Sequence, residues 1–127
     1  MPGPREVGSR SHHHIDLGKE DAAVCEEEMR RSKGLIEERL GIECRHFAYP
    51  YAVGSAVAEG VARRVFASAA LRPWGINRRG RIDPYRLGRI PVAENDTDLF
   101  FRARVRGLLE GPSSVYRAIQ RSRTNRA

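Results

Sequence analysis

The stretch CRHFAYPYAVGSAVAEGVARRVFASAA, residues 44–70, decides the fold of this chain. Its first residues, Cys44–Tyr49, predict a β-strand, which Pro50 ends because proline cannot continue a strand ladder. A helix is expected over about Gly54–Arg64, and the apolar run Val65–Ala70, which is rich in small residues, predicts a buried second strand. A strand, a helix and a strand in this order indicate an α/β chain with parallel strands.

The sequence before this stretch extends the same alternation. We expect a very short strand around Arg5–Gly8, a polar, His-rich loop over Ser9–Leu17 and a helix over Glu20–Leu40, which Gly41 ends. Two acidic residues are expected in the first turn of that helix: Glu20 and Asp21. Its apolar or small residues recur at three- and four-residue steps: Ala22, Cys25, Met29, Ser32, Ile36 and Leu40. The inward residues of the helix after Pro50 are expected to be Val57, Ala58 and Val61.

The sequence after this stretch predicts a loop over Arg72–Tyr85, because proline, glycine and asparagine gather there. A short strand follows over Leu87–Val92. Asp96 or Thr97 is placed to cap a helix that runs to about Leu109, and a last short helix leads into a basic tail. The chain thus divides into an α/β part and a helical C-terminal part.

Length and composition indicate a single soluble domain. The chain has 127 residues, of which 40% are hydrophobic and 31% charged, and no apolar run is long enough to cross a bilayer. No leader peptide is recognisable, so we expect a cytoplasmic location for the chain as written. Two cysteines, Cys25 and Cys44, are expected to be buried free thiols rather than a disulfide framework.

The net charge of +7 is unevenly distributed. From Leu71 onward 13 Arg stand against 5 acidic residues, whereas the first part is nearly neutral. A basic half is compatible with nucleic acid, anionic lipid or an acidic polymer as partner, and equally with an Arg-rich solvent face that binds none of them. Because no helix-turn-helix, zinc-finger or aromatic RNA-binding motif accompanies the charge, no specific nucleic-acid partner is expected.

Two segments contain residues that suggest chemistry. The run Ser11-His12-His13-His14 places one or two imidazoles where a tight loop could direct them at a metal, or it forms a solvated His cluster. The strand before Pro50 ends in Tyr49 and continues to Tyr51, so two aromatic residues are placed at its carboxyl end. In parallel α/β folds, ligands bind at that end.

Taken together, these segments resemble the NodB-homology polysaccharide deacetylases (carbohydrate esterase family 4). Residues 6–17 are similar to the family motif Gly-Ser-His-Thr-x-Thr-His-Pro-Asp-Leu, and Phe47–Tyr51 matches its Phe-Ala-Tyr-Pro-Tyr motif. Asp83–Val92 resembles the stretch that leads into the last barrel strand. The resemblance covers residues 5–92 as a partial NodB-homology domain, with C-terminal helices and a basic tail over 93–127.

The resemblance implies a partial (β/α) barrel that lacks its N-terminal strands. It also implies removal of acetyl groups from N-acetylated sugars of peptidoglycan, chitin-like polymer or exopolysaccharide. In the family a divalent metal, commonly zinc, polarises the acetyl carbonyl. By position, His14 is a metal ligand and Tyr51 offers its backbone N–H to the oxyanion, while Pro50 fixes the turn. Tyr49 and Trp74 are expected to contact substrate.

Several positions depart from the family pattern. The other metal histidine should lie four residues before His14, where Arg10 stands. Arginine has no lone pair to offer, and its charge repels a metal. No Thr-Phe-Asp-Asp-Gly segment, the source of the family's catalytic base, occurs in these residues. Ala48 replaces an arginine that many members have, and Arg89 stands where many have a histidine.

These departures lead to two hypotheses. The chain is expected to be a truncated, impaired deacetylase that binds metal weakly, whose full-length relatives are exported or membrane-associated. Alternatively, it is a catalytically dead remnant that binds carbohydrate through its aromatic residues: Tyr49, Tyr51, Trp74 and Tyr85.

Overall fold

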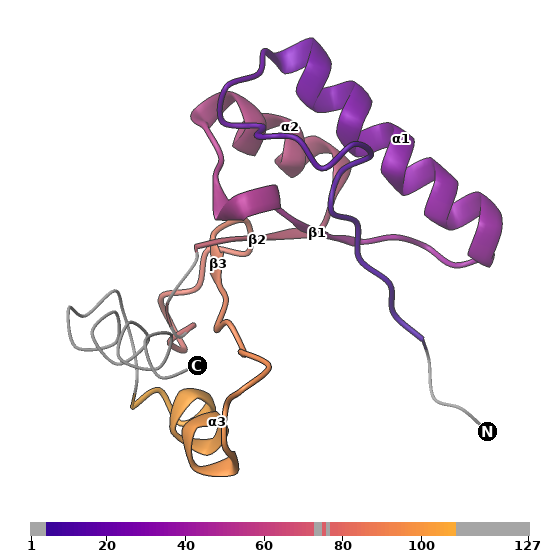
Figure 1. Ribbon diagram of the computed structural model, residues 1–127. Helices are drawn as coiled ribbons and strands as arrows, with labels where there is room; N and C mark the ends of the chain where they lie inside the picture. Colours follow the sequence, from indigo (N-terminus) through magenta and orange to yellow (C-terminus); the bar gives the residue numbers. More distant parts are fainter. Residues whose placement is uncertain (1–4, 73–74, 76, 109–127) are drawn as a thin grey trace.

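The computed structural model describes residues 5–72, 75 and 77–108, and it confirms an α/β chain built on a small parallel sheet. Its elements are, in chain order, α1 (Ala22–Leu40), β1 (His46–Ala48), the 3-10 turn η1 (Pro50–Ala52), α2 (Ala56–Val65), β2 (Ser68–Arg72), β3 (Leu87–Gly88) and α3 (Asp98–Val105). The strands are ordered β1-β2-β3, and α1 and α2 pack together on one side of them (Figure 1). The expected final helix and tail lie outside the described residues.

The sheet is extended beyond β1 by a single residue of the N-terminal segment. Ser9 donates its N–H to the His46 carbonyl at 2.8 Å and accepts the Ala48 N–H at 2.8 Å, which forms a parallel bridge opposite Phe47. The strand expected at Arg5–Gly8 is therefore wrong, because the pairing is made one residue later and continues no further. The order across the sheet is Ser9, β1, β2, β3.

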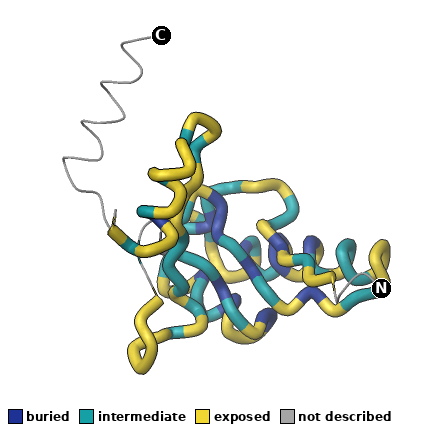
Figure 2. The backbone as a smooth tube through the Cα atoms, turned by 90° about the horizontal axis from the view of Figure 1, so that it is seen from below, coloured by how far each residue is buried: buried dark blue, intermediate teal, exposed yellow. Residues whose placement is uncertain are grey.

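The core lies between the sheet and the two N-terminal helices. The Phe47 ring stacks on Phe66 and meets Tyr49 edge to face, each with a 5.0 Å separation of ring centroids. Both cysteines are buried and free, as expected. The buried apolar residues are Leu17, Cys25, Met29, Cys44, Phe47, Tyr49, Ala58, Val61, Ala62, Val65, Phe66 and Ala69. In Figure 2 buried residues are dark blue, and they alternate along the chain with partly buried (teal) and exposed (yellow) ones.

Capping residues set the limits of the helices. Asp21 accepts the Val24 N–H at 2.9 Å, so α1 begins after Asp21, and the acids expected in its first turn precede it. Gly41 ends α1 in the left-handed conformation (φ 63°), as predicted. Ser55 caps α2, whose buried residues are Ala58, Val61, Ala62 and Val65. Val57 was expected to face inward, but it is 47% exposed because it lies off this helical face.

The other boundaries differ by a few residues from those predicted. β2 begins at Ser68 because Val65 is the last residue of α2 and Phe66 ends the helix. β1 and β3 are both shorter than expected. Thr97, one of the two expected caps, caps α3, which ends at Val105 rather than near Leu109. Across the described residues, none of the helices combines the length and apolarity that a membrane span requires.

Two glycines give opposite predictions for stability. In α1 Gly34 is exposed and an added Cβ meets nothing, so Gly34→Ala should raise the free energy of unfolding by about 0.5–1 kcal/mol. An added Cβ at Gly54 would lie 2.9 Å from Leu71 Cδ1 and 3.1 Å from Tyr49 Cε1. Gly54→Ala should therefore lower stability by about 1–3 kcal/mol. Urea unfolding of both variants checks the pair, and a loss of stability in Gly34→Ala would contradict the assignment of α1.

Candidate functional site

A buried carboxylate determines the course of the His-rich loop. Glu28, on the inner face of α1, is 6% exposed. Its Oε2 accepts the backbone N–H groups of His12 (3.1 Å) and His13 (2.8 Å), and its Oε1 lies 2.5 Å from His13 Nδ1. Burial raises the pKa of the Glu28 carboxyl, but the hydrogen bonds from His13 and His12 outweigh it, and the pKa lies below its usual value. The loop is thus attached to α1 through an ionised side chain.

Because His12 and His13 bind Glu28, His14 is the member of the run that contacts the carboxyl end of β1. Ser11 and His14 both have positive φ (64° and 56°), a costly backbone conformation for residues other than glycine. The Ser11 hydroxyl accepts the His14 N–H at 3.0 Å and stabilises the turn. His12 and His13 therefore turn toward α1, whereas the His14 ring packs edge-on against Tyr51, with the ring centroids 4.8 Å apart. The three adjacent histidines do not converge on one point.

The end of β1 forms a second strained turn. Tyr51 and Ala52 both have positive φ (56° and 55°), directly after the buried Pro50. The Tyr49 carbonyl accepts the Ala52 N–H at 3.2 Å. The Tyr51 side chain is 63% exposed and turns toward the His loop. Pro50, Tyr51 and His14 are therefore brought together at the carboxyl end of β1.

Arg10 donates a hydrogen bond to the ring nitrogen of His14 whose lone pair would otherwise be available to a metal. The Arg10 Nε donates to His14 Nε2 across 3.0 Å, and both side chains are exposed. Within the described part of the chain, no three His, Cys, Asp or Glu side chains are grouped closely enough to hold a metal ion. The donor atoms present here do not fit the metal that the family resemblance implies, because a cation already binds the one imidazole in place.

A second guanidinium reaches the same strand end from the opposite side. Arg89, which follows β3, donates its Nη2 to the Tyr49 carbonyl at 3.0 Å. Burial, together with the positive charge of Arg10, lowers the pKa of the Arg89 guanidinium. The positive charges of Arg10 and Arg89 therefore both act at the carboxyl end of β1.

The remaining expected substrate contacts have other positions. Tyr49 is fully buried, so its ring belongs to the core rather than to a sugar-binding surface. Burial strongly raises the pKa of its phenol. Tyr85 packs inward and donates its hydroxyl to the Phe66 carbonyl at 2.7 Å. Trp74 lies outside the described residues.

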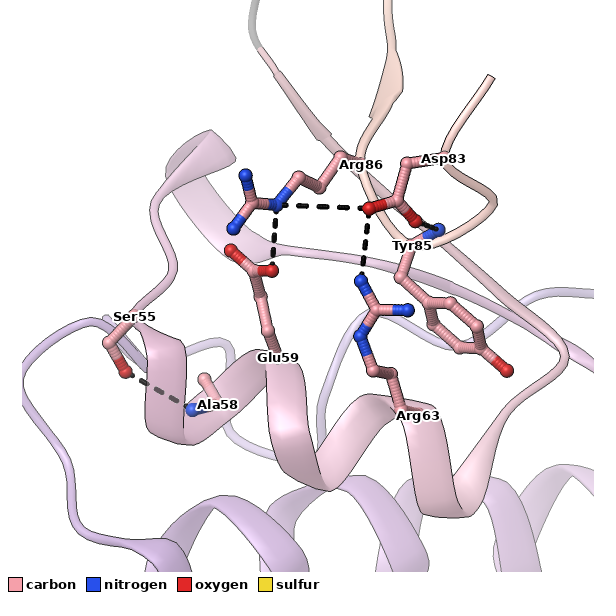
Figure 3. A network of polar contacts seen from close by, with 7 residues as sticks. All are labelled: Ser55, Ala58, Glu59, Arg63, Asp83, Tyr85 and Arg86. Atoms are coloured by element: carbon pink, nitrogen blue, oxygen red, sulfur yellow. Dashed lines mark hydrogen bonds and ion pairs between the residues drawn. The ribbon is translucent and has the colours of Figure 1, made fainter. Parts of the chain in front are cut away.

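A polar network positions the segment that carries Arg89 (Figure 3). From α2, Glu59 accepts the Arg86 Nε at 2.8 Å, and Arg63 donates to Asp83 at 2.9 Å. Asp83 also accepts the Tyr85 N–H at 2.9 Å. Composition alone would treat these charges as solvated surface residues. Their spacing on α2, four residues apart, was the only signal in the sequence, and it did not identify the partners.

Glu28 is the functional residue that sequence reasoning missed. It lies in a run of three glutamates, which suggests a solvated helix face. However, it follows Cys25 by three residues and precedes Ser32 by four, so it shares their buried face. A charged residue on the apolar face of an amphipathic helix was the signal that could have found it.

Comparison with known proteins places this geometry in context. Residues 2–69 match the family model described as Polysaccharide deacetylase. The fold resembles BC0361, a polysaccharide deacetylase from Bacillus cereus (TM-score 0.70, 20% identity), over 79% of this chain and 32% of that one. It also resembles IcaB from Ammonifex degensii (TM-score 0.62, 24% identity), over 78% of this chain and 45% of that one. The chain thus spans less than half the length of either structure. No curated protein matches the sequence.

The role of Glu28 predicts a pH-dependent loss of stability. Because folding lowers its pKa, its contribution is complete above the pKa of the unfolded state and disappears as the pH falls through the folded value. Glu28→Gln should cost about 1–3 kcal/mol at pH 7, since it replaces charge-assisted hydrogen bonds, and less in acid. Urea unfolding at both pH values measures the difference. The neighbouring exposed Glu27→Gln is the control, and an equal cost for both variants would contradict the proposed attachment.

Tyr49 offers a second test. Its hydroxyl is buried and has no hydrogen-bond partner among the described residues. Tyr49→Phe removes that unsatisfied group and keeps the ring, so stability should be unchanged or rise by about 1 kcal/mol. Thermal unfolding followed by circular dichroism checks this result. A drop of similar size would indicate that the hydroxyl forms a hydrogen bond.

Proposed function

Because the chain belongs to the polysaccharide deacetylase family, we propose that it acts on acetylated polysaccharide at the carboxyl end of β1. The proposed reaction is hydrolysis of the acetyl amide C–N bond of N-acetylated sugars. We further propose that this chain performs it poorly. The single observation that supports the site is the convergence of His14 and Tyr51 at 4.8 Å, produced by two turns of positive φ.

Tyr51 is the residue through which the acetyl group would be held. Its left-handed backbone, which follows Pro50, turns the chain sharply at the strand end. In the proposed complex the Tyr51 N–H donates a hydrogen bond to the acetyl oxygen, and this bond strengthens as negative charge develops there. The exposed Tyr51 ring would contact the sugar. In this proposal Tyr51 alone supplies both contacts, its backbone N–H to the acetyl oxygen and its ring to the sugar.

Arg10 is the reason we propose impaired hydrolysis. When bound, a divalent metal such as zinc would polarise the acetyl carbonyl, and His14 is the residue of this chain that would hold it. The Arg10 hydrogen bond competes for the same nitrogen, and the guanidinium charge opposes a second cation.

The same hydrogen bond favours a second candidate function, which is binding without hydrolysis. A site that keeps its acetyl-binding turn while its imidazole is bound to Arg10 would retain acetylated polymer and release no acetate. The two candidates share a binding surface and differ only in turnover.

The experiment compares the wild-type chain with Arg10→His. This change places a second imidazole four residues before His14 and removes the competing cation, so zinc affinity measured by calorimetry should rise about tenfold or more. Acetate release from N-acetylglucosamine oligomers and from peptidoglycan should be near background for the wild type. The exposed Arg30→His on α1 is the control.

Binding and turnover are measured separately. Tyr51→Ala should weaken binding of an N-acetylglucosamine tetramer about tenfold, as expected for loss of an aromatic contact. The exposed Leu40→Ala, at the end of α1, should leave binding unchanged. Absence of binding at millimolar tetramer would refute the proposed function. Rapid zinc-dependent acetate release by the wild type, unaffected by His14→Ala, would refute the impairment.

A further inference from the structure

Two arginines at the end of β1 lack the acidic partners that other arginines of the chain have. Arg63 and Arg86 bind carboxylates directly. Arg10 instead donates to the neutral acceptor nitrogen of His14, and Arg89 donates to a backbone carbonyl. Over residues 5–72, 75 and 77–108, no carboxylate lies in ion-pair contact with either Arg10 or Arg89. Their positive charges are therefore not neutralised by the described part of the chain.

The sheet register places Arg10 on the face of the sheet that points away from the helices. Ser9, Phe47 and Ala69 are paired across the sheet and buried, and the Ser9 hydroxyl contacts Ser32 of α1 at 2.5 Å. Since side chains alternate along extended segments, the residues that follow these three face away from the helices. Those residues are Arg10, Ala48 and Ala70.

The side chains between the two arginines are small. Ala48 and Ala70 are partners in the register of β1 and β2, and each is only partly buried. Arg10 lies beyond β1 on one side, and Arg89 reaches Tyr49 from β3 on the other. The side chains that lie between the two guanidinium groups on this face are therefore only methyl groups. Burial and, after it, the positive charge of Arg10 lower the pKa of Arg89, and an anion between the two cations would offset their repulsion.

We propose that Arg10 and Arg89 form a fixed-cation site that binds a carboxylate, and that this carboxylate belongs to an acidic sugar of the acetylated polysaccharide. This inference rests on the proposed function, because it assigns the class of polymer. It extends that function from acetylated sugars in general to polymers that also carry negative charge.

The chemistry of arginine supports a carboxylate over other ligands. A guanidinium presents its N–H groups as a planar fork that matches the two oxygens of a carboxylate. The Arg10 Nε donates a hydrogen bond to His14, and its two Nη groups make no hydrogen bond or ion pair with the described residues. His14 therefore becomes a positioning residue that orients the fork. Acetate, the product of deacetylation, contains the same group, so the test must separate the two sources.

The test is calorimetric titration of the full chain at low salt with sodium glucuronate, sodium acetate and the uncharged N-acetylglucosamine trimer. Glucuronate should bind more tightly than acetate. Arg10→Gln and Arg89→Gln should each weaken glucuronate binding about tenfold, the effect of losing one charge-assisted pair. The matched control Arg30→Gln, at an exposed position of α1, should leave the glucuronate affinity unchanged. Arg89→Lys should give an intermediate affinity, because it keeps the charge and loses the fork.

Several outcomes would overturn the assignment. Equal glucuronate affinity in wild type and Arg10→Gln would refute the site, provided that both melt cooperatively. Acetate binding as tight as glucuronate binding would assign the site to product and refute the acidic sugar. If the uncharged trimer binds but glucuronate does not, the carboxylate site fails and the proposed function stands. If glucuronate binds and the trimer does not, the site stands and the proposed function fails.

Discussion

The geometry of the candidate site depends on one buried carboxylate. Glu28 accepts two consecutive backbone N–H groups and contacts the His13 ring, and it does so from the inner face of α1. Burying a charge is costly unless hydrogen bonds satisfy it, and here they do. The Glu28 hydrogen bonds to His12 and His13 and the Ser11 hydroxyl together hold the loop in the positive-φ turn at His14. The orientation of the only histidine at the strand end therefore follows from a residue on a different element.

The sheet and the site are linked through hydrogen bonds on both sides of β1. Ser9 pairs with β1 and so fixes the start of the loop that carries Arg10. On the other side, Arg86 and Asp83 attach the segment before β3 to α2, which brings Arg89 to the Tyr49 carbonyl. Exposed ion pairs contribute little to stability individually. Their role here is positional, since they connect α2 to the segment before β3.

Belonging to a family of deacetylases does not by itself give this chain their chemistry. The turn of positive φ after Pro50 brings Tyr51 beside His14, and the acetyl-binding part of the site is proposed from it. Arg10 changes the other part, because a guanidinium next to His14 supplies a permanent positive charge and removes a metal ligand at the same time. This is why we propose that the site recognises the charge of its substrate rather than a bound metal.

The sequence by itself determined the α/β class, the alternation of helices and strands after residue 20, the Gly41 helix end, and Asp96 or Thr97 as the cap of α3. These follow from local periodicity, capping and motif spacing, which are written in neighbouring residues. The tertiary structure alone decided which side chains have partners far away in the sequence: Glu28 is buried against the His-rich loop, Tyr49 belongs to the core, and Arg89 binds the Tyr49 carbonyl. Such facts depend on contacts between residues far apart in the chain, and no local pattern specifies the partner of a polar side chain.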